Sequence, residues 1–211
     1  MAVKKKRRDY DGRPSVTTII GQTLGWSKDA LIGWAYKLGK EGRSLRERDD
    51  AATLGSCVHY LVAKEFGAEE TDEEYEPAVI EAATPNAARV VEWIKERYEV
   101  VACERAIVGE DYAGTLDYVL RDKQDGALLV ADLKTGKGVY DEVAVQLGAY
   151  AKLWANTTND QGISGGLVIH AHPGEPLVGY AVTDQQVETG AEVFRQLLAI
   201  YSARGLLRVK P

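Results

Sequence analysis

The segment 127–135, with the sequence ALLVADLKT, is the part of the chain that most restricts its fold. Alternate residues of a strand point to opposite faces, so Leu128 and Val130 share one face while Leu129 and Leu133 share the other. A strand that is apolar on both faces is typical of the centre of a sheet that helices cover on both sides. The segment therefore predicts an α/β architecture with a buried central strand.

Changes in the spacing of apolar residues predict the elements around this strand. We expect strands at 100–108, 114–121, 127–135, 166–171 and 176–182, helices at 27–40, 44–66, 84–98, 142–156 and 184–203, and an extended stretch at 14–20. Thr183 or Asp184 is expected to cap the last helix. The order differs from the regular alternation of a dinucleotide-binding fold. It predicts a mixed central sheet of about five strands flanked by helices, with an N-terminal helical part.

Charge is distributed unevenly along the 211 residues, although the net charge is only −6. Residues 1–48 carry 12 Lys and Arg against 5 Asp and Glu, whereas the rest of the chain is acidic. A basic N-terminal part favours contact with a polyanion such as nucleic acid, through Lys4, Lys5, Lys6, Arg7 and Arg8. The alternative is that residues 1–13 form only a solvated, flexible tail ahead of a single domain at 14–211.

The composition excludes several other classes of protein. Cys57 and Cys103 are too few for a disulfide scaffold or for an iron–sulfur cluster held by four thiolates. No apolar run approaches the roughly 18 residues that span a membrane, and no apolar stretch follows the charged first residues as a secretory signal requires. We therefore expect a protein of the reducing cytoplasm that has no membrane partner.

Two carboxylates are predicted to face each other across neighbouring strands. If the second and third strands form a hairpin with the loop 123–126, Asp117 lies opposite Asp132, with Cβ atoms roughly 4.5–5.5 Å apart. Lys134 follows two residues later on the same face. Opposed carboxylates between buried strands repel each other, and a hard cation such as Mg²⁺ or Mn²⁺ would relieve the repulsion. The alternative is an ordinary Asp–Lys ion pair at the end of a strand.

Two other patterns receive mainly structural interpretations. His170 and His172 alternate along the chain and so share a face, where packing or exposure to solvent is favoured over a second metal site. The sequence Thr135-Gly-Lys-Gly138 lacks the Ser or Thr that follows the lysine of a Walker motif. It predicts a turn between a strand and a helix, from which Lys137 contacts a DNA backbone.

Five short motifs in order resemble the PD-(D/E)XK nuclease superfamily, and its RecB-like branch in particular, which includes the CRISPR-associated exonucleases and related phage nucleases. They are Gly55-Ser-Cys-Val-His59, Glu104 on a strand, GTLDYV at 114–119, VADLKTGK at 130–137 and QLGAY at 146–150. Together they cover roughly residues 50–156. The resemblance implies a restriction-endonuclease-like core.

The resemblance also implies a metal site. The ligands of a Mg²⁺ or Mn²⁺ ion would be His59, Asp117, Asp132 and the backbone carbonyl of Leu133. Glu104 is expected beyond these ligands, either in a second layer around the metal or in strand pairing. The iron–sulfur cluster of the CRISPR-associated relatives is not expected, because neither of the two cysteines lies in the C-terminal region where the cluster would be held.

A metal-dependent DNA nuclease is the function that the resemblance implies. Lys134 would orient or activate the attacking water, and Gln146 and Tyr150 would position Lys134 or a DNA phosphate. We expect an exonuclease of DNA recombination, repair or phage genome processing, in the cytoplasm of a bacterium or of a phage host. Its partners would be DNA ends, a recombinase or single-strand annealing protein, and further copies of the chain. An endonuclease of the same fold and a non-catalytic DNA-binding or assembly module remain open.

Overall fold

The computed structural model describes residues 10–26, 32–33, 36–37, 39–40, 46–68, 74–158 and 162–207. Among these residues, five strands form one sheet in the order β1-β2-β3-β4-β5. The strands are β1 (Tyr98–Val108), β2 (Ala113–Asp122), β3 (Leu128–Lys134), β4 (Ile163–His170) and β5 (Val178–Val182). β3 and β4 run parallel and the other neighbours run antiparallel, so the sheet is mixed as predicted.

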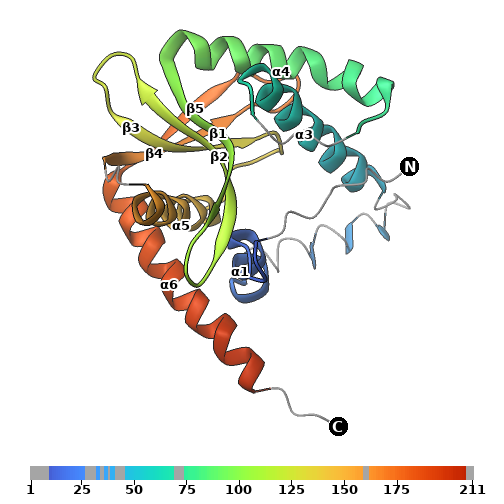
Figure 1. The fold of residues 1–211 in the computed structure, drawn as a ribbon. Coiled ribbons are helices and arrows are strands. Elements are labelled where there is room, and N and C mark those ends of the chain that lie inside the picture. Colours follow the sequence, from blue (N-terminus) through green and yellow to red (C-terminus); the bar gives the residue numbers. More distant parts are fainter. Residues whose placement is uncertain are drawn as a thin grey trace.

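Helices cover both faces of this sheet (Figure 1). One face packs against α1 (Val16–Thr23), α5 (Glu142–Thr157) and α6 (Asp184–Leu206), and the other against α3 (Arg46–Glu65) and α4 (Pro77–Arg97). β3 contributes Val130 to the first core and Leu133 to the second, so it is buried from both sides. The predicted central strand and its flanking helices are confirmed.

The hairpin of β2 and β3 has the predicted register. Its paired residues run from the turn at 123–126 to the pair formed by Tyr118 and Ala131. The ladder ends at that pair, although both strands continue beyond it. The next residues along the two strands, Asp117 and Asp132, therefore lie where β2 and β3 begin to separate.

The extended stretch expected at 14–20 is wrong, because α1 begins there at Val16. Ser15 caps the helix, since its hydroxyl oxygen accepts a hydrogen bond from the Thr18 N–H at 3.1 Å. Val16 and Ile19, one turn apart, are both fully buried. The β-branched residues favour a strand locally, but the cap and the burial of one helical face outweigh that preference.

Helix boundaries differ most at α4, which was expected at 84–98 and begins at Pro77 instead. Proline suits the first turn of a helix because the N–H groups there have no partner within the helix. Pro85, which lay near the expected start, falls inside the helix. The cap expected for the last helix is confirmed at Thr183, whose hydroxyl oxygen accepts from the Gln186 N–H.

Some predictions lie outside the described residues, namely the basic run Lys4–Arg8 with the rest of residues 1–9, and most of the helix expected at 27–40. Tyr10, which belongs to the expected tail, contacts the domain, because its hydroxyl forms a 2.9 Å hydrogen bond with Thr115 Oγ1. Within the part of the chain that is described, none of the helices has the length and apolar character that a membrane span requires.

Candidate active site

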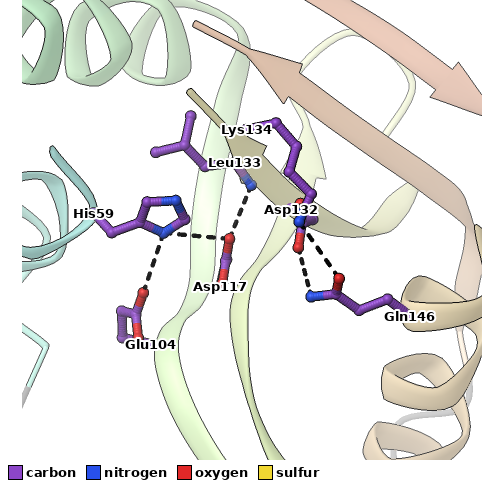
Figure 2. A network of polar contacts seen from close by, with 7 residues as sticks. All are labelled: His59, Glu104, Asp117, Asp132, Leu133, Lys134 and Gln146. Carbon is purple, nitrogen blue, oxygen red and sulfur yellow. Dashed lines mark hydrogen bonds and ion pairs between the residues drawn. The ribbon is translucent and has the colours of Figure 1, made fainter. Parts of the chain in front are cut away.

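Three side chains converge where α3 approaches β1 and β2 (Figure 2). His59 extends from α3, and its Nδ1 lies 3.5 Å from Asp117 Oδ2 and 3.6 Å from Glu104 Oε1. One possible ligand atom from each of the three residues lies within 4.8 Å of the other two. We call this group the His59 cluster.

The backbone explains how two carboxylates reach one point. Glu104 lies between two residues of β1 that pair with the neighbours of Asp117 in β2, so the two acidic residues are adjacent across the strands. Glu104 has a φ of 45°, which is uncommon for a residue other than glycine. Asp117 is fixed from the other side, because its Oδ2 accepts a 2.9 Å hydrogen bond from the Leu133 N–H across the opening between β2 and β3.

A second group lies beside the first and consists of Asp132, Lys134 and Gln146 (Figure 2). Lys134 Nζ is 2.7 Å from Asp132 Oδ2, and Gln146 Nε2 on α5 donates to Asp132 Oδ1 at 2.7 Å. Lys134 Nζ also donates to Gln146 Oε1, at 3.4 Å. Asp132 therefore binds a lysine and an amide and lies outside the His59 cluster. We call this second group the Lys134 triad.

Burial and charge together shift the pKa values of these groups. Burial acts to lower the pKa of His59, but Asp117 and Glu104 outweigh it and raise this pKa to about 9. Burial, followed by the charge of Asp117, raises the pKa of Asp132 to about 6. Burial would lower the pKa of Lys134, but Asp132 and Asp117 raise it above its usual value. Both His59 and Lys134 are therefore positively charged at neutral pH when no cation is bound.

The donors of the His59 cluster fit a divalent cation. Carboxylate oxygens suit Mg²⁺ and Mn²⁺, and an imidazole nitrogen moves the preference toward Mn²⁺ and other transition metals. The two carboxylates repel each other at a half-buried site, and a cation would offset the repulsion. Glu104 thus joins the possible ligands, whereas the sequence placed it beyond them. Leu133 lies beside the site, where its N–H donates to Asp117. The roles of the Leu133 carbonyl and of Asp132 as metal ligands stay predictions.

Both groups open into one cleft of about 1060 Å³. Two further predicted residues, Tyr150 and Lys137, line the same cleft. Tyr150 is only 3% exposed and packs against Gly114, where a Cβ would lie 2.7 Å from Tyr150 Cε1. Its place in the cleft wall thus depends on close packing with β2.

Sequence reasoning missed several residues that line the cleft, among them Tyr10 and Asn86. Asn86 is 8% exposed, so it is a polar residue on the buried face of α4. A polar residue at an apolar position of a helix is a signal that could have found it. Tyr10 gives no such signal, because its place depends on how the segment before α1 folds back onto β2.

A comparison with families of known proteins addresses the same residues. The family model of the PD-(D/E)XK nuclease superfamily matches residues 31–208, a range that includes the His59 cluster and the Lys134 triad. The chain belongs to the PD-(D/E)XK nuclease superfamily. It is therefore a member of a superfamily of metal-dependent nucleases that act on DNA.

The other comparisons add little to the assignment of the chain to the PD-(D/E)XK nuclease superfamily. No curated protein matches its sequence. Among solved structures, the crystal structure of SSO0001 aligns over 70% of this chain and 74% of its own, with 18% sequence identity and a TM-score of 0.34. A likeness at that level carries no argument about function, and the family assignment depends on the family model alone.

Proposed function

We propose that the protein is a metal-dependent DNA exonuclease of the RecB-like branch, active in DNA recombination, repair or phage genome processing. One observation carries the proposal, namely that the His59 cluster and the Lys134 triad lie side by side in one cleft. A module that only binds DNA would gain nothing from three carboxylates beside a half-buried lysine, since carboxylates repel phosphates. The order of the five sequence motifs supports the RecB-like branch.

The His59 cluster would hold the divalent cation in this proposal. Such a cation supplies positive charge to a phosphate and lowers the pKa of a neighbouring water. His59 must lose its proton to bind the cation, because only the neutral imidazole is a ligand. Glu104 and Asp117 contribute the negative charge that keeps the cation in place.

Lys134 acts as a cation in this proposal, not as a base. Its pKa is raised, so Nζ keeps its proton at neutral pH and can donate to the attacking water or to a phosphate oxygen. Asp132 and Gln146 hold Nζ from two sides and leave it little freedom to turn away. Tyr150 would support this arrangement from the wall of the cleft.

A cleavage assay tests the proposal. End-labelled linear DNA and covalently closed circular DNA are incubated with the protein and Mg²⁺, Mn²⁺ or EDTA. We expect loss of the linear DNA with metal, no loss with EDTA, and intact circles. Lys134→Ala should lower the rate by about 100-fold or more. Lys152→Ala is the matched control, because this lysine of α5 pairs with Glu188 on α6, outside the cleft.

Each other result has a definite meaning. Metal-dependent cleavage at an unchanged rate by Lys134→Ala would refute the role of the Lys134 triad. Cutting of circles would replace the exonuclease with an endonuclease of the same fold. No cleavage of single- or double-stranded DNA with either metal would refute the nuclease proposal and favour a DNA-binding module.

A further inference from the structure

The turn that follows Lys134 is held by two histidines that the proposed mechanism does not use. His172 Nδ1 lies 3.0 Å from Thr135 O, and His170 Nε2 lies 2.8 Å from Gly136 O. The two rings are nearly parallel, with 12° between their planes and 6.5 Å between their centroids. We call His170 and His172 the histidine clamp.

The partners of the clamp fix the position of the ring hydrogens. A carbonyl oxygen can only accept, so the ring nitrogen that faces it must carry the hydrogen. His172 therefore has its hydrogen on Nδ1, and His170 has its hydrogen on Nε2. The two histidines thus use different nitrogens to bind successive carbonyl groups of the same turn.

Helix α4 supports the clamp through hydrogen bonds from Asn86 and Arg89. Asn86 Nδ2 donates to Ala171 O at 2.7 Å, and Ala171 N–H donates to Lys134 O at 2.8 Å. Arg89 donates to Asn86 Oδ1 at 2.6 Å and to His172 O at 3.1 Å. Since Asn86 is almost fully buried, this path from α4 to the backbone of Lys134 is protected from competition by water.

Helix α3 closes the other side of the turn. A Cβ at Gly55 would lie 2.5 Å from Thr135 Oγ1, so the turn and the helix are in close contact. Lys134 and Lys137, at the two ends of the turn, both line the cleft. The backbone between two cleft lysines is therefore held by the clamp on one side and by α3 on the other.

We propose that His170 and His172 are positioning residues for the nuclease reaction, because they hold the Thr135 and Gly136 carbonyl oxygens and thereby present Lys134 and Lys137 to DNA phosphates in the cleft. This inference rests on the proposed function and names the residues on which its lysines depend. His172 also lines the cleft, but in this proposal both histidines act through the turn and not on the reacting atoms. A displacement of about 1 Å at such a site lowers the rate by about 100-fold.

Crossed substitutions at the two histidines test the proposal by activity. The amide nitrogen of Asn reaches about as far as Nδ1 of histidine, and that of Gln reaches about as far as Nε2. We expect His172→Asn and His170→Gln to keep kcat close to that of the wild type. The two single variants with the substitutes exchanged, His172→Gln and His170→Asn, should each lose roughly tenfold to a hundredfold in kcat.

A role in packing alone would give a different pattern. Asn is smaller than Gln, so packing would rank the two substitutes in the same order at both positions, whereas the proposal requires opposite orders. Melting temperatures of the four variants show which are folded, and only folded variants are compared. The same rank order at both positions overturns the proposal.

The second measurement needs no activity and no substitution that could prevent folding. Long-range ¹H–¹⁵N NMR spectra of the metal-free wild-type protein distinguish the Nδ1–H tautomer of a histidine ring from the Nε2–H tautomer. The chain has three histidines, so the spectrum is simple to assign. We expect the Nδ1–H form at His172 and the Nε2–H form at His170, and the reverse in either residue overturns the clamp.

The two proposals fail in different ways. A wild-type protein that cleaves no DNA with either metal refutes the nuclease function and, with it, the positioning role. If the wild-type protein is active and all four variants keep its kcat, the positioning role of the histidine clamp is refuted. The nuclease function is then unaffected.

Discussion

The crossing of α5 and α6 leaves no room for a side chain at Gly148 or Gly190, so it is sensitive to a small change at either position. A Cβ at Gly148 would lie 2.5 Å from Val187 O, and a Cβ at Gly190 would lie 2.6 Å from Ala144 C. Both distances are below any that real Cβ atoms adopt, and the obstacles are backbone atoms that no rotamer change can move. Gly190→Ala must therefore push the two helices apart.

The loss of stability in Gly190→Ala is the difference between two opposing effects. Overpacking of a core costs about 1–3 kcal/mol, and a contact with backbone belongs at the upper end of that range. Alanine regains about 1 kcal/mol over glycine inside a helix, so the net loss is about 2 kcal/mol. For a chain of this size, the melting temperature should fall by about 4–8 °C.

A matched control is present in α1. Gly21 also lies in a helix, but nothing lies within 4 Å of a Cβ built there. Gly21→Ala should therefore raise the melting temperature by about 2–4 °C through helix propensity alone. Calorimetric scans of both variants and the wild type measure the difference. A Gly190→Ala variant as stable as Gly21→Ala would refute the close crossing.

Other contacts give tests of the site. Mn²⁺ binding at about pH 7.5 should release close to one proton per ion, because the pKa of His59 is about 9 and the ion binds the neutral imidazole. The affinity for Mn²⁺ should therefore rise about tenfold per pH unit below that pKa and level off above it. Calorimetry in buffers of different ionisation enthalpy detects the released proton. In the same titration, Glu104→Gln should weaken Mn²⁺ binding about tenfold or more, and an unchanged affinity would exclude this carboxylate from the ligands. Asn86→Ala should lower the free energy of unfolding in urea by about 1–3 kcal/mol, since the buried Ala171 O loses its donor, and equal stability would contradict that bond.

The sheet and the pairing of β2 with β3 could be predicted because independent local signals agree there. The turn-forming residues at 123–126 fix the register of the hairpin, and the apolar residues on both faces of β3 place it inside the sheet. Because the register is local, it also placed Asp117 and Asp132 at the same level of the sheet. The sequence could not show that the ladder ends at Tyr118 and Ala131, one residue before Asp117 and Asp132, since this depends on contacts from other elements.

The division of the site into two groups could not be predicted for a related reason. Gln146 on α5 turns Asp132 toward Lys134, and His59 on α3 attracts the other two carboxylates. The positive φ of Glu104 is equally invisible in a pattern of alternating residues. Spacing along the chain defines which residues share a strand face, but the direction of a carboxylate depends on its non-local partners.

The unusual backbone at Glu104 also affects how the protein meets other copies of itself. β1 is an edge of the sheet, and the unpaired N–H and C=O groups of a long, regular edge can bind a strand from another molecule. The edge of β1 is interrupted twice, by an irregularity between Val100 and Ala102 and by the turned residue Glu104. An incoming strand could form only a short ladder there. The conformation that brings a carboxylate to His59 thereby also disfavours edge-to-edge pairing at β1.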